Sequence, residues 1–138
     1  MRARSRYRYV MTIAVAYRPD EFGRAALEWA AAEARAKDDS LILINVSRVE
    51  PRLDAGHARG THLQTIKESL AADKIGFEVR QVEGDNIADS VLFEAEQAGA
   101  TLIVLGVRRR SPVGKALMGS VAQSILLDSS IPVVAVKP

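Results

Sequence analysis

The chain has 138 residues, 48% of them hydrophobic and 26% charged, which predicts one globular domain over residues 1–138. It has no cysteine, which excludes disulfides, thiol catalysis and cysteine-based zinc sites and is compatible with a cytoplasmic location. The formal net charge is only +2, but basic residues gather in two clusters, so the rest of the chain is acidic. These clusters are Arg2, Arg4, Arg6 and Arg8, in an amino end that we expect to be flexible over residues 1–8, and Arg108, Arg109, Arg110 and Lys115.

The beginning of the chain predicts a strand and then a helix. Residues 10–16 are an apolar, β-rich run that ends at Tyr17-Arg18-Pro19, where proline disfavours helical backbone before it. A secretory signal has a similar basic start, but this apolar run is short for one, so we interpret it as a core strand. Asp20 can cap the following helix, whose apolar stripe consists of Phe22, Ala26, Leu27, Trp29, Ala30 and Ala34.

The next segment predicts a second strand, a long connection and a second helix. Residues 40–46 are continuously apolar, as in a parallel strand that is buried on both faces. Residues 47–60 have no periodicity and form a long connection, after which Leu63, Ile66 and Leu70 mark the helix. The chain has two histidines, His57 and His62, and we expect both to be solvated loop residues.

The second half of the chain continues the alternation. Residues 77–82 alternate between apolar and polar, which favours a strand at a sheet edge, and Asp85 or Asn86 can cap a third helix. Residues 100–106 predict another strand buried on both faces, followed by a helix over 120–127 and a strand over 131–136.

Regular alternation of strands and helices predicts an α/β fold with one doubly wound parallel sheet of five strands and helices on both faces. Ligands of such sheets bind beyond the carboxyl ends of the strands, where the strand order reverses. If the first and fourth strands are central neighbours, residues 17–20 and 106–121 flank that crevice.

Two common nucleotide motifs are absent. Gly114-Lys115 suggests a P-loop, but Arg109 stands where its first glycine belongs and Ala116 where serine or threonine belongs. No G-x-G-x-x-G follows the first strand. Since no side chain is distinguished as a general base or a metal ligand, we predict no enzymatic activity, with weak ATP hydrolysis left open.

Gly106 and the Gly119-Ser120 pair stand at the two ends of the link between the fourth strand and the last helix. The unpaired amides and positive dipole at the start of that helix attract anions, and the Ser120 hydroxyl can donate to a phosphate oxygen. The alternative is that Ser120 and Gln123 form an S-x-x-Q capping box, with Ser120 satisfying its own helix.

Three segments in this order resemble the universal stress protein (UspA) family over nearly the whole chain. They are "TIAVAY" followed by "ALEWA", "GDNIADSVLFEAEQAGATLIVLG", and "GVRRRSPVGKALMGSVAQSIL" followed by "IPVVAVKP". The resemblance implies a Rossmann-like, adenine nucleotide alpha hydrolase-like fold with sheet order 3-2-1-4-5.

The resemblance also implies a nucleotide site. ATP-binding members carry G-x2-G-x9-G-[ST], which here reads Gly106, Arg109, Gly119 and Ser120, so three of four positions match. Arg109 could crowd a phosphate or grip it with a bidentate fork. Tyr17 replaces the family's usual aspartate, and its ring could pack against an adenine face. The expected site residues are Ala16, Tyr17, Val46, Gly106, Arg108, Arg109, Gly119, Ser120 and Val121.

The function that the resemblance implies is that of a stress-response sensor or regulator binding ATP, AMP or cyclic AMP, with magnesium held only through nucleotide phosphates. Tyr17 and Arg109 support the alternative of an interaction module that binds no nucleotide. In the family that the chain resembles, the last strand commonly pairs with its twofold mate, so the resemblance implies a homodimer through residues 133–136, with a regulatory protein partner of unknown identity. Nucleic acid is disfavoured because Arg108, Arg109 and Arg110 have no interleaved aromatic residues, and no further segment is long and apolar enough for a membrane.

Overall fold

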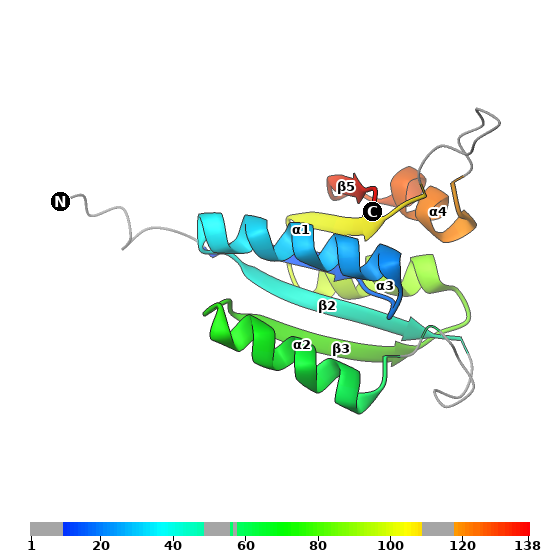
Figure 1. Cartoon of the computed structure of the whole chain (residues 1–138). Coiled ribbons are helices and arrows are strands. Elements are labelled where there is room, and N and C mark those ends of the chain that lie inside the picture. Colours follow the sequence, from blue (N-terminus) through cyan, green and yellow to red (C-terminus); the bar gives the residue numbers. More distant parts are fainter. Residues whose placement is uncertain (1–9, 49–55, 57, 109–117) are drawn as a thin grey trace.

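The computed structural model describes residues 10–48, 56, 58–108 and 118–138, and strands alternate with helices through them (Figure 1). The predicted order of elements is confirmed, with ends that differ from the expected ones by a few residues. The elements are β1 (Thr12–Ala16), α1 (Glu21–Lys37), β2 (Ser40–Ser47), α2 (Gly60–Ala72), β3 (Phe77–Glu83), α3 (Ile87–Gln97), β4 (Leu102–Gly106), α4 (Ser120–Asp128) and β5 (Val133–Val136).

The sheet has the predicted order β3-β2-β1-β4-β5, and each neighbouring pair is parallel. Helices α1 and α2 cover one face of the sheet, and α3 and α4 cover the other (Figure 1). Each face has its own buried cluster, so the sheet lies between two apolar layers. The doubly wound fold class is therefore confirmed.

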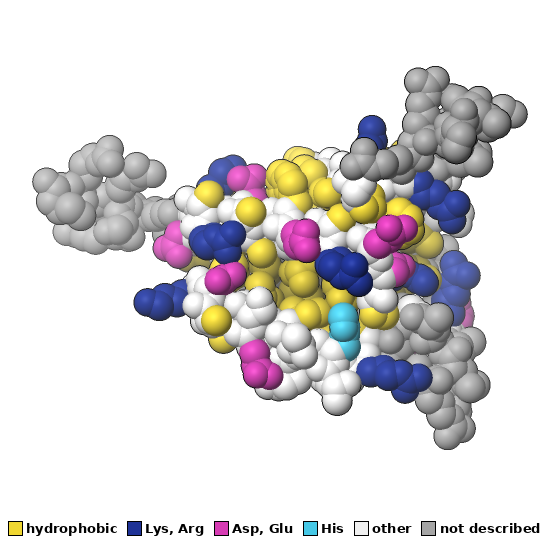
Figure 2. Space-filling view, in the orientation of Figure 1, with side chains coloured by type: hydrophobic (Ala, Val, Ile, Leu, Met, Phe, Trp, Pro, Cys, Tyr) yellow, Lys and Arg dark blue, Asp and Glu magenta, His cyan; other side chains and the backbone are white. Residues whose placement is uncertain are grey.

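Burial along the strands follows from position in the sheet. Every residue of β2 after Ser40 is buried, whereas the residues of β3 are all half-buried or exposed, as expected of an edge strand. Figure 2 shows the face that carries α1 and α2, where charged side chains lie along the helices and hydrophobic side chains are visible between them.

Two helices begin at the predicted caps. The Asp20 carboxylate accepts a hydrogen bond from the Gly23 amide at 2.9 Å, and the Asn86 side chain accepts one from the Asp89 amide at 3.0 Å. Asn86, and not Asp85, is thus the cap of α3. Each cap satisfies a backbone donor that has no partner within its helix.

The end of β4 packs directly on the first turn of α1. A Cβ atom added to Gly106 would lie 2.7 Å from the Phe22 Cα and closer still to the Phe22 carbonyl oxygen. Real side chains do not approach backbone atoms this closely, so the helix could not sit here against any residue other than glycine. Gly106 is therefore explained by the fold alone.

Several sequence predictions lie outside the described residues. These are the flexible amino end at residues 1–8, most of the 47–60 connection with His57, and the stretch that includes Arg109, Arg110, Gly114 and Lys115. Within the part of the chain that is described, no helix is long and apolar enough to cross a membrane.

We expect Gly106→Ala to lower the free energy of unfolding by at least about 2 kcal/mol, because the added methyl group forces the first turn of α1 away from β4. Urea unfolding followed by circular dichroism measures the change. Gly60→Ala is the matched control, since a Cβ there meets nothing within 4 Å. Equal stability of both variants and the wild type would contradict the packing argument.

Candidate functional site

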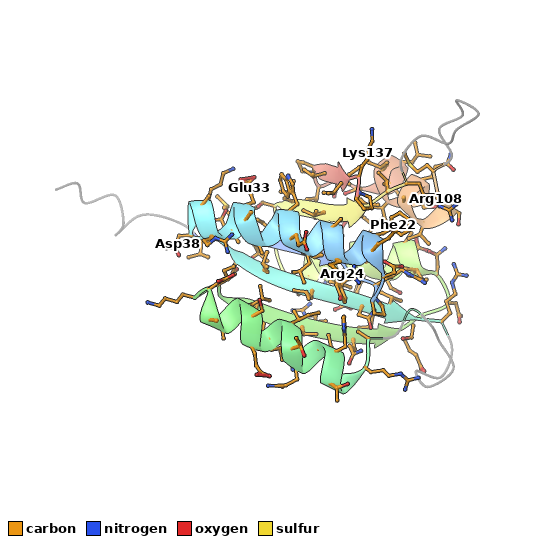
Figure 3. All side chains as sticks on the ribbon, in the orientation of Figure 1. Phe22, Arg24, Glu33, Asp38, Arg108 and Lys137 are labelled. Atoms are coloured by element: carbon orange, nitrogen blue, oxygen red, sulfur yellow. The ribbon has the colours of Figure 1, made fainter. Side chains whose placement is uncertain are left out.

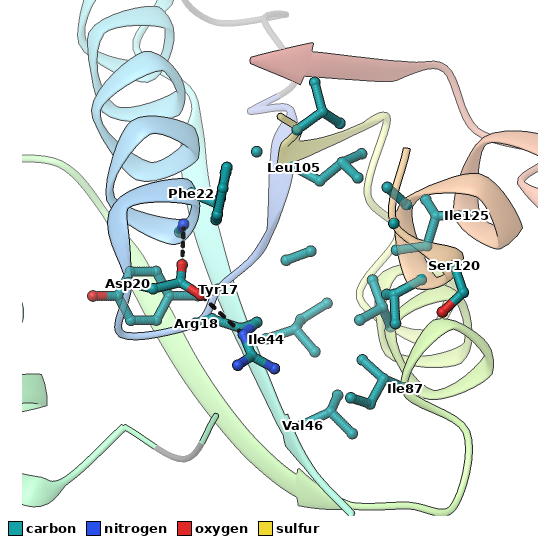
Figure 4. Close-up of a pocket in the computed structure, with 18 of the residues that line it drawn as sticks. Tyr17, Arg18, Asp20, Phe22, Ile44, Val46, Ile87, Leu105, Ser120 and Ile125 are labelled. Carbon is teal, nitrogen blue, oxygen red and sulfur yellow. Dashed lines mark hydrogen bonds and ion pairs between the residues drawn. The ribbon is translucent and has the colours of Figure 1, made fainter. Parts of the chain in front are cut away.

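A cavity of about 350 Å³ opens at the carboxyl ends of β1 and β4, where the strand order reverses (Figure 4). The structure brings eight of the nine expected site residues to its lining, and the ninth, Arg109, lies outside the described residues. Their contact with a ligand stays a prediction. The eight are Ala16, Tyr17, Val46, Gly106, Arg108, Gly119, Ser120 and Val121.

The walls of the cavity are mostly apolar. They are built from the ends of β2 and β4 and from the facing sides of α3 and α4, so a flat, weakly polar group can be enclosed there. Ala16, at the end of β1, contributes only a methyl group to this face. Apart from the alanines, the apolar residues are Phe22, Ile44, Val46, Ile87, Val91, Leu105, Val107, Val121 and Ile125.

The first turn of α4 borders the cavity with backbone amides that have no partner within the helix. Gly119 is the N-cap, with extended backbone, and no side chain caps the helix. The capping-box alternative for Ser120 and Gln123 is therefore wrong, because Ser120 is already the first helical residue and not the cap. The Ser120 hydroxyl has no hydrogen-bond partner among the described residues, and Figure 4 shows it on the α4 side of the cavity.

Tyr17 does not present its ring to the cavity. The side chain is only 4% exposed and belongs to the cluster under α1 and α2, on the opposite face of the sheet (Figure 4). Its hydroxyl hydrogen-bonds His62 Nε2, and the two rings stack with centroids 5.7 Å apart. The idea that this ring packs against adenine is wrong for this structure. His62, on α2, is a half-buried partner of Tyr17 and not a solvated loop residue.

Burial raises the pKa of the Tyr17 hydroxyl above its ordinary value, opposed by the positive charge of Arg24 and assisted by the negative charge of Asp20. Arg24 extends from α1 at this end of the helix (Figure 3). The phenol is thus neutral in the folded protein across the physiological pH range.

The buried side chain of Asn45 hydrogen-bonds the backbone of segments that lie next to the cavity. It is 1% exposed, and its side-chain amide donates to the Tyr17 carbonyl at 2.9 Å and to the Gly56 carbonyl at 2.7 Å. Its oxygen accepts from the Ala58 amide at 2.8 Å and from the Gln81 side chain at 3.1 Å. These bonds use the full hydrogen-bonding capacity of a buried amide and tie together β1, β2, β3 and the end of the long connection.

Arg18 and Asp20 are cavity residues that the sequence analysis left out of the site. Arg18 Nε donates to the second carboxylate oxygen of Asp20 at 3.0 Å, while the first caps α1. The dashed lines of Figure 4 mark both bonds. The signal that could have found Arg18 was its place, directly beyond the carboxyl end of a central strand.

A parallel sheet in the order β3-β2-β1-β4-β5, with a cavity between β1 and β4, defines a protein of the adenine nucleotide alpha hydrolase-like fold. Residues 10–137 match the model of the universal stress protein family, and the chain belongs to that family. It is 40% identical over 126 residues to a universal stress protein from Mycolicibacterium smegmatis, a match that covers 91% of this chain and 97% of that one.

Solved structures share the fold at low identity. A universal stress protein from Archaeoglobus fulgidus in complex with dAMP superposes with a TM-score of 0.62 at 18% identity, covering 94% of this chain and 98% of that one. A universal stress protein in complex with cAMP gives a TM-score of 0.69 at 23% identity, with 91% and 95% covered.

A pH prediction follows from Tyr17. Its raised pKa means that the folded state favours the neutral phenol, so this contribution to stability is present below pH ~10 and is lost as the pH rises through the folded-state pKa. We expect Tyr17→Phe to cost about 1 kcal/mol at neutral pH through the lost bond to His62, and to lose stability less steeply than the wild type above pH ~10. Denaturant unfolding at several pH values tests this, and parallel pH curves would contradict it.

Proposed function

We propose that this protein binds an adenine nucleotide in the cavity between β1 and β4 and acts in the stress response as a sensor or regulator. One observation carries the proposal: residues from the ends of β1, β2 and β4 and from the start of α4 line a single cavity, and among them are three of the four positions of the family motif, Gly106, Gly119 and Ser120. The cavity combines apolar walls with open donors at one end, which suits a ligand with a flat base and an anionic tail.

The two ends of the cavity suggest how such a ligand lies. The phosphates belong at the start of α4, where the Gly119 and Ser120 region offers backbone donors and a free hydroxyl. Arg108, on the exposed segment after β4, adds positive charge near that end (Figure 3). The base then lies toward Val46 and Ile44, among apolar side chains.

The relatives in complex with dAMP and cAMP support the choice of ligand. We propose AMP, cyclic AMP and ATP as ligands. In the described residues no group of three or more histidine, aspartate or glutamate side chains is arranged to hold a metal ion. Magnesium would therefore enter with the nucleotide and be held through its phosphates.

We propose that the site binds without catalysing a reaction. Asp20 is the one carboxylate among the described residues that line the cavity, and it is occupied by Arg18 and the Gly23 amide. Both of its oxygens therefore already accept a hydrogen bond from the protein itself. A cytoplasmic location fits a sensor of nucleotide levels.

We also propose a homodimer in which β5 pairs with its twofold mate. β5 has β4 on one side and no strand on the other among the described residues. Its four residues are half-buried or exposed, and an open edge of valines needs a covering partner in solution. A regulatory protein partner of unknown identity completes this proposal.

The proposed phosphate end predicts that Ser120→Ala weakens AMP binding about tenfold, since one hydrogen bond to a charged oxygen is lost. Titration calorimetry with AMP, ATP and cyclic AMP measures the change, and Ser69→Ala on the distant helix α2 is the control. If binding survives the double change Gly119→Val and Ser120→Ala, the phosphate end lies elsewhere. If the wild type binds none of the three nucleotides at millimolar concentration, the alternative of an interaction module that binds no nucleotide stands.

The proposed dimer predicts that Ala135→Pro gives a monomer. Backbone groups alternate in direction along a strand, and the carbonyls of Pro132 and Val136 accept bonds from β4, so the Ala135 amide faces the open edge. Proline at position 135 removes a backbone donor that pairing with a second β5 needs. It leaves the hydrogen bonds between β4 and β5 in place. Light scattering after size-exclusion chromatography measures the mass. Val10→Ser, just before the amino end of β1, is the control and should leave the mass unchanged. If the Ala135→Pro variant stays dimeric, the β5 interface is contradicted.

A further inference from the structure

The sheet has a second open edge, at β3. This strand has β2 on one side and no strand on the other among the described residues, and Figure 1 shows it as the outermost strand on the side away from β5. The Gly76 carbonyl and the Gly84 amide, on either side of β3 in the sequence, both bond to β2. Backbone groups alternate in direction along a strand, so the amides and carbonyls of Phe77 and Val79 face the open edge. A further strand can therefore pair there.

The two faces of this edge differ in chemistry. On the face that α2 covers, Phe77 and Val79 are half-buried apolar residues that pack against the core. On the face of α3, the Arg80 side chain pairs with Glu78 at 2.6 Å and with Glu94 at 3.2 Å. Two carboxylates thus share one guanidinium, and this face of the edge keeps a negative charge.

A cavity of about 340 Å³ between the second half of β3 and α3 continues the acidic face. Glu83, Asp89 and Glu94 line it, and the first two have no ion-pair partner within the described part of the chain. Phe93 also lines it and is 58% exposed. Carboxylates beside an open aromatic ring suit an arginine side chain, because its guanidinium pairs with the carboxylates and stacks on the ring.

The chain itself contains a segment of matching chemistry. Residues 2–8 carry an arginine at every second position, and Tyr7 and Tyr9 lie between and after the last of them in the sequence. Successive side chains of an extended segment point to opposite sides, so the four arginines would share one side and the tyrosines the other. The arginine side matches the acidic face of the β3 edge, and the tyrosine side matches Phe77 and Val79.

A second copy can supply this segment more easily than the same chain can. The segment leads into β1, and both β2 and β3 lie between β1 and the open edge. Neighbouring strands are about 4.8 Å apart, so the chain would have to cross roughly 14 Å, about four extended residues, and turn sharply at each end of the crossing. Residues 1–11 contain no glycine or proline, the residues that sharp turns favour.

We propose that the open edge of β3 binds residues 2–8 of a second copy of this chain as an added strand, with the arginines over the acidic face. This contact does not depend on the nucleotide site. It also leaves β5 free, because β3 and β5 are opposite edges of one sheet. Both contacts together produce an assembly larger than a dimer.

Sedimentation velocity on the full chain tests the assembly. At about 50 mM salt we expect the wild type to gain mass with protein concentration, and at about 0.5 M salt we expect the gain to disappear, because exposed charges are then screened. A variant that lacks residues 2–8 should contain a constant number of copies in both. If the wild type and this variant contain the same number of copies at every protein and salt concentration, the proposal is overturned.

A labelled peptide of residues 2–9, added to the variant that lacks residues 2–8, tests the strand itself by fluorescence anisotropy. The matched control is a peptide with the same residues in which the four arginines are consecutive, since it keeps the charge and loses the alternation. We expect the control to bind about tenfold more weakly, a difference of about 1.4 kcal/mol. Equal affinities would mean general charge attraction and would refute strand addition.

Charge reversal locates the peptide on β3. Glu83→Lys with Asp89→Lys should weaken peptide binding about tenfold, because attraction becomes repulsion at two exposed positions. Glu21→Lys with Glu28→Lys, on exposed positions of α1, is the matched control, since it changes the net charge by the same amount. Circular dichroism checks that both variants are folded. If both pairs of substitutions weaken binding equally, the peptide responds to net charge and the β3 edge is not its site.

Discussion

The alternation of small and large side chains along β1 decides what each face of the sheet can hold. Successive residues of a strand point to opposite faces, so Ile13, Val15 and Tyr17 fill the core under α1 and α2. Ala14 and Ala16 face α3 and α4, and their small size leaves the space that becomes the cavity. The cavity exists because the central strand carries methyl groups on one face and bulky groups on the other.

The two outer glycines of the family motif have different physical reasons. Gly106 is required by the close approach of the Phe22 backbone, and it would be required whether or not a ligand binds. Gly119 has open space around the position of a Cβ, so the described structure does not require glycine there. The missing side chain of Gly119 matters only if a ligand approaches the start of α4. Of the two positions, Gly119 is therefore the more informative about a ligand.

The fold was predictable because it depends on patterns that are local in sequence. Continuous apolar runs, the alternation in β3 and the Asp20 cap each predicted an element or a place in the sheet correctly. The side chains of the site were harder, since they depend on which face a residue takes at the end of a strand. Tyr17 lies one residue beyond β1, and the strand's alternation, continued by that residue, turns its ring away from the cavity and toward His62.

The site is held in place from one position, the first turn of α1. Asp20 begins that turn and orients Arg18, while the Phe22 backbone lies against Gly106 at the end of β4. A Cβ at Gly23 would lie 2.6 Å from the Arg18 backbone nitrogen, so glycine lets the turn rest on the segment after β1 as well. Backbone packed this closely on two strand ends has little room to move. A ligand at this end of the cavity would therefore not have to order it first.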